Sequence, residues 1–485
     1  MTLLIKDALS EALSKHPDND AVRESKRGKI VSYSYAEFVA LIQDAKLWFD
    51  KQPEHNFGIA TSNTVSGIAN VYGAMASGKR ICMLDPSLSL NNIADALTKS
   101  GATCILCEDS SLVKAIQESE DTQKFNAQPL YKPKVPQSIN AQILLEEIEA
   151  WNEDGELVFF TSGTTKSSKA ALNSFEKVCL ASYTIYKLAN FDTTCEVYIP
   201  APIHHLYGFN SFAAFLCMGH VCCIGSATRI SNDLPKFNAQ IGVFVPSYAQ
   251  YALKRQPGEL KKLKHLLLSS APTPLSVQEG CAELGICAHN VYGSSELGTI
   301  AMSLESTDFN LLSYDESKKF YLTDEGELCA ISQFAMAGYM EDGKLGIPAA
   351  QLFDKDGAYH TGDGASIKSE NSFELLGRLD SILVLPNGEK LICADHENAL
   401  CKLNGVEESA VAFIDGKLTA FIVPTKEIAS LGTSTTQEKL QAELDSFNKT
   451  QALAFRIVRL VVLEKPLPRT ALGKLKRNEL PALAK

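Results

Sequence analysis

The sequence predicts an α/β protein with a large N-terminal domain of doubly wound sheets, followed by a small α+β domain. Short apolar strands alternate with helix-like segments through most of the chain, which is typical of parallel sheets covered by helices. That pattern changes near residue 377, and 485 residues exceed what one hydrophobic core usually holds. We therefore expect domains at residues 1–379 and 380–485.

The first part of the chain begins with an amphipathic pattern at its N-terminus, which predicts a helix. A second helix is predicted after Ser34, because apolar residues recur there at helical spacing. Short apolar runs predict strands at residues 57–61, 80–85, 103–109 and 157–160.

The alternation resumes after residue 170 and predicts strands at residues 196–199, 221–224, 242–246 and 266–269. From residue 325 to 376, short strands with Gly and Asp turns predict antiparallel sheet or a small β-barrel-like subdomain. The C-terminal domain is expected to hold helices near 396–403 and 436–447, and strands at 409–414, 418–423 and 458–463.

Composition and charge exclude several classes of protein. A net charge of −11 argues against nucleic acid as a partner, and no apolar run reaches the roughly 18 residues that a membrane span needs. Thirteen cysteines show no disulfide framework, which favours a reducing, cytoplasmic location. Residues 451–485 carry eight Lys or Arg against two Glu, a net charge of +6, which favours an anionic partner.

The stretch TSGTTKSS, residues 161–168, follows an apolar strand and holds six hydroxyl side chains and one glycine, Gly163. Lys166 and Lys169 add positive charge. Exposed N–H groups, hydroxyls and lysines together suit a polyphosphate. The stretch is not a Walker A loop, because Ser168 stands where that pattern requires glycine. An ordinary Ser/Thr-rich surface loop is the alternative.

Four later stretches carry further candidates: NVYGSSELG (290–298), YHTGDG (359–364), GRLD (377–380) and PRTALGK (468–474). Glu296 offers a carboxylate beside Gly293, which allows close backbone approach. Asp363 is expected in a tight turn, where it can bind ribose hydroxyls, and Arg378 suits a phosphate. Each stretch alone also fits a simple turn whose polar groups are satisfied locally.

Taken in this order and spacing, the five stretches resemble those of the adenylate-forming superfamily of acyl-CoA synthetases, adenylation domains and beetle luciferases. The resemblance extends from about Tyr35 to Leu480 and is strongest to acyl- or aryl-CoA synthetases. It implies an acid–thiol ligase that uses ATP, Mg²⁺ and CoA, or the phosphopantetheine of a carrier protein. A carboxylic acid would attack the α-phosphorus of ATP, and a thiol would then displace AMP.

The resemblance also implies roles for matching residues. The catalytic ones are Lys474, Glu296, His205 and Thr165, with Glu296 as the Mg²⁺ ligand. Asp380 matches the hinge of the mobile domain. ATP would be held by Thr161, Ser162, Gly163, Thr164, Thr165, Lys169, Asn290, Tyr292, Gly293, Ser295, Asp363 and Arg378.

The stretch PIHHLYGF, residues 202–209, resembles the segment that places a histidine, here His205, at the acyl channel. No aspartate follows nearby to hold a substrate ammonium, which favours an acid without an α-amino group. Lys166 and Ser168 depart from the family's usual glycine and proline.

Three alternatives stay open at this point. Loading of a carrier protein uses the same adenylation chemistry, and a luciferase-like oxygenase would consume the adenylate with oxygen. The third is a non-catalytic nucleotide-binding protein, which the altered phosphate loop favours and the retained Lys169, Glu296, Asp363, Arg378 and Lys474 oppose.

Overall fold

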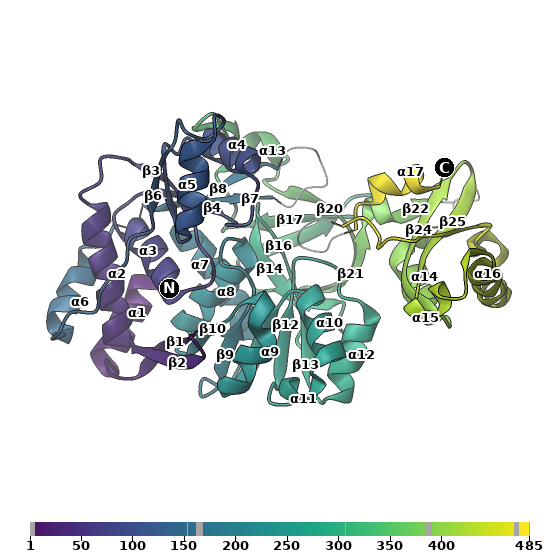
Figure 1. The fold of residues 1–485 in the computed structure, drawn as a ribbon, viewed down its shortest axis with the longest axis horizontal. Helices are drawn as coiled ribbons and strands as arrows, with labels where there is room; N and C mark the ends of the chain where they lie inside the picture. Colours follow the sequence, from purple (N-terminus) through teal and green to yellow (C-terminus); the bar gives the residue numbers. More distant parts are fainter. Residues whose placement is uncertain are drawn as a thin grey trace. The chain divides into compact units, whose positions relative to one another are not determined.

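The computed structural model describes residues 5–152, 154–161, 168–305, 307–384, 390–469 and 475–484. Its contacts divide the chain into two compact units, whose elements are labelled in Figure 1. Unit 1 comprises Met1–Ser270, Ser276–Phe320 and Ala330–Tyr359, and unit 2 comprises Ala271–Leu275, Tyr321–Cys329 and His360–Lys485. The mixed α/β architecture confirms the predicted fold class.

Helix α1 (Ile5–Lys15) and helix α2 (Tyr35–Phe49) occupy the two positions predicted near the N-terminus. Ser34 caps α2, because its hydroxyl accepts from the Glu37 backbone N–H while the Glu37 carboxylate accepts from the Ser34 N–H. This capping box satisfies two N–H groups that a helix start otherwise leaves unpaired. The helix begins where the sequence pattern placed it.

One sheet of unit 1 has a parallel part with the order β7-β4-β3-β5-β6. Helices α4 (Leu90–Ser100) and α5 (Ser110–Glu118) pack on one face through a shared core. Helix α2 packs on the other face, where the rings of Phe49 and Phe57 lie 5.3 Å apart. The parallel strands are β3 (Asn56–Ala60), β4 (Arg80–Leu84), β5 (Cys104–Cys107), β6 (Asn126–Pro129) and β7 (Glu156–Phe160).

A second parallel array in unit 1 has the order β13-β12-β11-β9-β10-β1. Cys223 joins the core formed with α10 (Pro246–Arg255) and α12 (Leu275–Glu283). The Cys222 thiol faces the opposite side, beside the Phe212 carbonyl of α8 (Leu206–Cys217). The strands are β1 (Asp20–Lys26), β9 (Glu196–Ile199), β10 (Cys222–Ile224), β11 (Ala239–Phe244), β12 (His265–Leu268) and β13 (Cys287–Ser294).

The predicted strand at 242–246 is wrong at its end, because β11 stops at Phe244 and Pro246 opens α10. Proline is favoured at a first helical position, where no N–H is needed. Further elements are α3 (Val65–Ala76), α6 (Ala141–Glu149), α7 (Phe175–Tyr186), α9 (Ile230–Asp233), α11 (Pro257–Leu260), α13 (Ala349–Leu352), β2 (Lys29–Ser34), β15 (Leu311–Ser313), β16 (Lys318–Leu322) and β17 (Glu327–Ser332).

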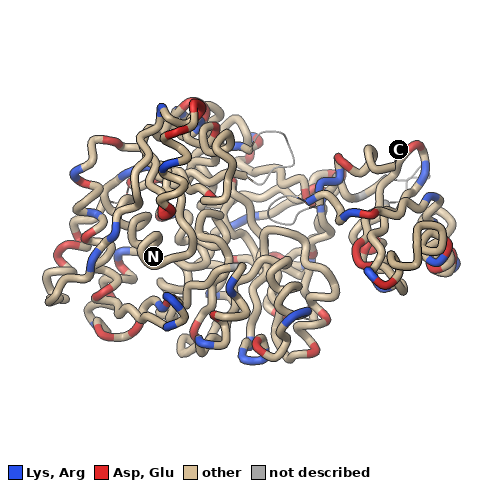
Figure 2. The backbone as a smooth tube through the Cα atoms, in the orientation of Figure 1, with Lys and Arg blue, Asp and Glu red and all other residues tan. Residues whose placement is uncertain are grey.

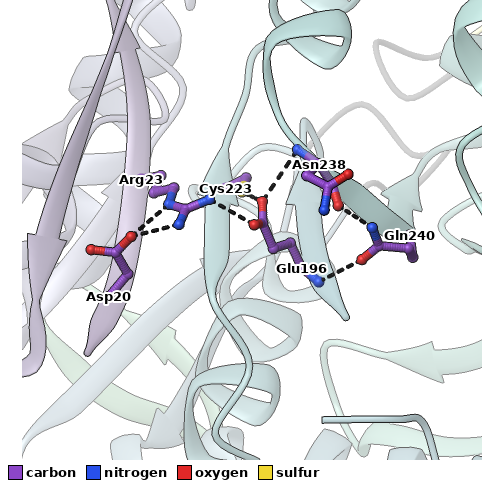
Figure 3. A network of polar contacts seen from close by, with 6 residues as sticks. All are labelled: Asp20, Arg23, Glu196, Cys223, Asn238 and Gln240. Atoms are coloured by element: carbon purple, nitrogen blue, oxygen red, sulfur yellow. Dashed lines mark hydrogen bonds and ion pairs between the residues drawn. The ribbon is translucent and has the colours of Figure 1, made fainter. Parts of the chain in front are cut away.

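A polar network ties the starting ends of several strands of this array together (Figure 3). Arg23 donates to Asp20 at 2.6 Å and to Glu196 at 2.6 Å. Glu196 also accepts from the Asn238 backbone N–H at 3.3 Å, so one carboxylate joins β1, β9 and the start of β11. Because the half-buried Arg23–Glu196 ion pair has several further partners, it fixes the register of these strands at the N-terminal edge of the sheet.

Unit 2 contains the predicted α+β pattern at the C-terminus. Helices α14 and α16 share a core with one face of a three-stranded sheet of order β24-β25-β26, and Leu467 and Leu480 cover the other face. Its elements are β20 (Tyr359–Ser369), β21 (Ser372–Arg378), β22 (Ile382–Val384), β23 (Lys390–Ile392), α14 (Cys393–Cys401), β24 (Val406–Ile414), β25 (Lys417–Pro424), α15 (Lys426–Ala429), α16 (Thr433–Thr450), β26 (Arg459–Val462) and α17 (Leu480–Leu483).

All thirteen cysteines are outside disulfide bonds, as the lack of a disulfide framework in the sequence predicted. Among the helices in the described ranges, none has the length and apolar character needed to cross a bilayer.

Candidate active site

Each parallel array of unit 1 is extended by an antiparallel hairpin, and the two hairpins carry the candidate ATP residues of this unit. Strand β7 pairs with β8 (Ala170–Ser174), and β13 pairs with β14 (Gly298–Met302). Strand β8 is followed in the sheet by β18 (Gly338–Glu341) and β19 (Lys344–Pro348). A strand that reverses direction exposes its turn at the carboxyl edge of the parallel strands, where ligands of open α/β sheets bind.

The phosphate-loop stretch closes at its base through backbone pairing. The Thr161 N–H donates to the Lys169 carbonyl at 3.0 Å, and the Lys169 N–H donates to Thr161 Oγ1 at 3.3 Å. Lys99 Nζ donates to the Ser168 carbonyl at 3.0 Å, which braces the exit of the loop. The other predicted phosphate-binding residues lie outside the described residues: Ser162, Gly163, Thr164 and Thr165, together with Lys166.

The β13–β14 hairpin turns through residues 295–297, so Ser295 and Glu296 stand at its tip. A Cβ atom at Gly293 would lie 2.4 Å from the Gly298 carbonyl oxygen, so only glycine permits this close strand approach. The expected close backbone approach at Gly293 is therefore confirmed, and its part in ATP binding stays a prediction. Asn290 pairs with Ser303 through its backbone, and Tyr292 packs beside Leu297 and Ile300.

Glu296 is buried, with 8% of its surface exposed, and Tyr339 Oη donates to its Oε1 at 2.6 Å. Burial and the neighbouring carboxylate raise the pKa of the Tyr339 hydroxyl, so the hydroxyl keeps its proton. Strand β18 brings Tyr339 opposite Ala171 of β8, and Lys169 Nζ lies 4.8 Å from the centre of its ring. Lys169, Tyr339 and Glu296 therefore form one connected group.

The oxygen atoms of this group are of the kind that binds Mg²⁺. Mg²⁺ prefers oxygen ligands and is usually held by one or two carboxylates together with substrate phosphates. The buried Glu296 carboxylate offers oxygen atoms of this kind, and a cation bound beside it would offset the cost of burying its charge.

His205 lies directly before α8, beside His204 and close to Asp85 at the carboxyl end of β4. His204 Nε2 lies 3.6 Å from Asp85 Oδ2, and the two histidine rings are 4.6 Å apart. Burial, with repulsion from His204, lowers the pKa of His205 to about 3. The histidine is thus a neutral group at physiological pH.

The segment that carries His205 is fixed by Asn63. The Asn63 side-chain amide donates to the Ala201 carbonyl at 2.8 Å, and its oxygen accepts from the Ile203 N–H at 2.9 Å. The Asn63 side chain, from the loop before α3, therefore holds the backbone on both sides of Pro202. The orientation of His205, three residues after Pro202, depends on this support.

Because the pKa of His205 lies near 3, we expect it to stay neutral from pH 5 to 9. His205→Gln should lower kcat/KM for the acid by about 10-fold through the loss of the packed imidazole ring. It should leave the acid limb of the pH profile unchanged. Steady-state rates of the two proteins between pH 5 and 8 test this, and an acid limb near pH 6 that disappears in His205→Gln would refute the neutral state.

Asp363 and Arg378 in unit 2 face each other across the β20–β21 pair. Arg378 Nη1 donates to Asp363 Oδ1 at 3.2 Å and to the Thr361 carbonyl at 2.6 Å. The expectation of a tight turn at Asp363 is wrong, because this residue lies within β20. The turn-like signal comes from Gly362, which has a φ of +70° although it lies within the strand. Its missing Cβ also makes room for the Arg378 guanidinium, which lies 2.5 Å from where a Cβ would stand.

Asp380 lies in the short 3₁₀ helix Leu379–Ser381, and Lys474 lies outside the described residues.

The sequence matches the AMP-binding enzyme family over residues 9–340, and the C-terminal domain of AMP-binding enzymes over residues 380–483. The chain belongs to the AMP-binding enzyme family. This confirms the resemblance to adenylate-forming enzymes that the five stretches indicated.

Individual AMP-binding relatives agree with this membership. A methyl-dioxo-octahydroindenyl-propanoyl:CoA ligase of Rhodococcus jostii is 26% identical over 348 residues, which are 68% of this chain and 65% of that relative. The structure of ATP-bound MatB from Rhodopseudomonas palustris has a TM-score of 0.76 and 18% identity, covering 98% of both chains. That of o-succinylbenzoate CoA synthetase from Bacillus subtilis with an acyl-adenylate has a TM-score of 0.75 and 19% identity, covering 98% of this chain and 97% of the other.

Sequence reasoning missed several residues of this AMP-binding chain. Tyr339 ends the stretch GELCAISQFAMAGY, residues 326–339, and nothing in that pattern indicates a bond to Glu296. Asp85 and Asn63 lie more than one hundred residues before the His205 segment that they contact, so only the fold brings them together.

The basic C-terminal tail is less available to an anion than its charge indicated. Within unit 2, Arg469 pairs with Glu408 at 2.8 Å and Arg477 with Glu397 at 2.7 Å. Figure 2 shows acidic and basic residues interspersed in this part of the chain. Carboxylates from outside residues 451–485 therefore neutralise part of the net charge of +6.

Proposed function

We propose that this protein is an ATP-dependent carboxylate–thiol ligase, which adenylates a carboxylic acid and transfers the acyl group to CoA. Membership of the AMP-binding family supports this, and the connected group of Glu296, Tyr339 and Lys169 carries it in the structure. Lys169, together with a cation held at Glu296, would neutralise polyphosphate charge, which is what an attack on the α-phosphorus of ATP requires.

The first half-reaction needs positioning more than a protein nucleophile. In this proposal the N–H groups and hydroxyls of residues 161–165, with Lys169, hold the β- and γ-phosphates, and Tyr292 stacks on adenine. Asn290 and Gly293 of β13, with Ser295 of the turn that follows it, would contribute to the same nucleotide-binding site. Asp363 accepts hydrogen bonds from the ribose hydroxyls. Arg378 donates to the Asp363 carboxylate and so keeps it oriented.

Glu296 would hold Mg²⁺, which supplies charge neutralisation on the phosphates when it is bound. Lys474 would contact the incoming carboxylate and the α-phosphate, where negative charge grows in the transition state. Asp380 would be the hinge between domains at residues 1–379 and 380–485, whose rotation exchanges the adenylating and thioester-forming arrangements.

CoA is the proposed thiol, with a carrier-protein phosphopantetheine as the alternative. The ion pairs of Arg469 and Arg477 favour CoA, because a carrier's acidic surface needs an extended basic face that those pairs diminish. Thioester formation should therefore be faster with CoA than with a phosphopantetheinylated carrier at equal concentration. A carrier preferred by more than about tenfold in kcat/KM, or ~1.4 kcal/mol, would contradict the proposal.

The acid is proposed to be a simple one without an α-amino group, since neutral His205 offers no charge to an ammonium or a second carboxylate. Free thiols and an absent membrane-spanning helix in the described ranges are compatible with a proposed cytoplasmic location. Pyrophosphate release against fatty, aryl, dicarboxylic and amino acids tests the substrate class. Release that depends on an amino acid alone would contradict it.

A further inference from the structure

The starting ends of β12 and β13 bring two histidines and a cysteine together. His265 opens β12, whereas Cys287 and His289 are the first and third residues of β13. Residues two apart on a strand face the same side, and the register sets His265 beside Cys287. The ligating atoms of the three side chains lie within 4.8 Å of one another.

Hydrogen bonding determines which nitrogen of His289 faces this cluster. His289 Nδ1 lies 2.8 Å from the Ser303 carbonyl oxygen, which can only accept, so Nδ1 carries the hydrogen. Nε2 is then left with a lone pair, and it lies 3.0 Å from His265 Nδ1. A backbone carbonyl that orients a histidine in this way is the usual support of a metal-ligating imidazole.

We propose that His265 Nδ1, Cys287 Sγ and His289 Nε2 form a binding site for one zinc ion. Two imidazoles and a thiolate are the donors that Zn²⁺ prefers, whereas Mg²⁺ takes oxygen ligands. Tetrahedral zinc with bonds of about 2.0–2.1 Å holds two nitrogens about 3.3 Å apart, so the histidine pair must separate by only about 0.3 Å. Zinc displaces the thiol proton of Cys287 to solvent, and the hydrogen of His265 moves to its Nε2.

The fourth ligand of this zinc site is water, because Cys287 and His265 are only partly buried. Phe191 closes the opposite side, with its ring 5.1 Å from that of His265 and 5.7 Å from that of His289. Apolar cover of this kind excludes water from the ligand nitrogens and strengthens their bonds to the ion.

The zinc site lies at the start of β13, whereas the Glu296 turn of the proposed ATP site follows its end at Ser294, and about 3.3 Å per residue puts the two ends roughly 20 Å apart. Asn290 directly follows His289, but successive residues of a strand face opposite sides of the sheet. The inference therefore does not depend on the proposed ligase activity, and zinc binding can be measured without substrates.

The test is a titration of the full-length, metal-stripped protein with Zn²⁺ in competition with a chromophoric chelator, without nucleotide. We expect one tight equivalent, and Co²⁺ in its place should show a thiolate-to-metal charge-transfer band. Cys287→Ser and His265→Gln should each weaken binding by about 100-fold or more, and Cys287→Ser should abolish the band.

Two matched variants separate this site from other thiols and imidazoles. Cys401→Ser removes an exposed cysteine of α14, and His204→Gln alters the cluster with Asp85. Both should retain the tight equivalent. The inference is overturned if wild type binds no tight equivalent, or if folded His265→Gln and Cys287→Ser, checked by thermal melting, bind as tightly as Cys401→Ser.

Discussion

Lys474→Ala should lower the rate of acyl-adenylate formation by about 100-fold or more, the expected cost of removing a charge contact made in the transition state. The stretch PRTALGK and the match of residues 380–483 to the C-terminal domain of AMP-binding enzymes motivate this expectation. Pyrophosphate release at saturating acid and ATP measures it.

The thiol-transfer half-reaction separates a specific role of Lys474 from a general defect. Thioester formation from supplied acyl-adenylate should be nearly unchanged in Lys474→Ala, because in the proposal Lys474 contacts the carboxylate and the α-phosphate only in the adenylating arrangement. Lys476→Ala is the matched control, since Lys476 lies two residues on and pairs with Glu479 at 3.0 Å. Equal losses in both half-reactions would show that Lys474 acts on folding or domain position instead.

Glu296→Gln should reduce adenylation by about 10²–10³-fold, equivalent to ~3–4 kcal/mol of transition-state stabilisation. The amide keeps the size of the side chain and still accepts from Tyr339, so the change removes charge with little change in packing. The Mg²⁺ concentration required for half-maximal rate should rise as well. Pyrophosphate release measured across a Mg²⁺ series tests both parts.

Tyr339→Phe provides the comparison for Glu296→Gln. It removes the 2.6 Å hydrogen bond but leaves the carboxylate charge, so we expect a loss of about 10-fold, in line with one hydrogen bond to a charged group. A Glu296→Gln enzyme that keeps the wild-type Mg²⁺ dependence would exclude Glu296 as the metal ligand.

Most of the fold could be predicted from local sequence patterns. The pattern places strand β9 at its observed bounds and starts α2 directly after the serine that caps it, because burial and capping both act within a few residues. The pattern misplaces the end of β11, because the apolar run continues into Pro246, which opens α10.

The site was predicted less completely, for a physical reason. Glu296 and Gly293 stand out because hairpin geometry is local, so their neighbours could be read from the chain. The partners of these residues come from other strands: Tyr339 reaches Glu296 only through the β8–β18 pairing. Asp363 looked like a turn residue because Gly362 adopts a turn-like φ inside a strand.

The most direct test of adenylation is to follow the carboxylate oxygen that joins the acid to the nucleotide in the acyl-adenylate. With acid labelled by ¹⁸O in both carboxylate oxygens, ATP and CoA, attack on the α-phosphorus leaves one carboxylate oxygen on AMP after the thiol displaces it. We predict one ¹⁸O in each AMP released and none in pyrophosphate, measured by mass spectrometry. Label in inorganic phosphate with formation of ADP, or unlabelled AMP, would contradict it.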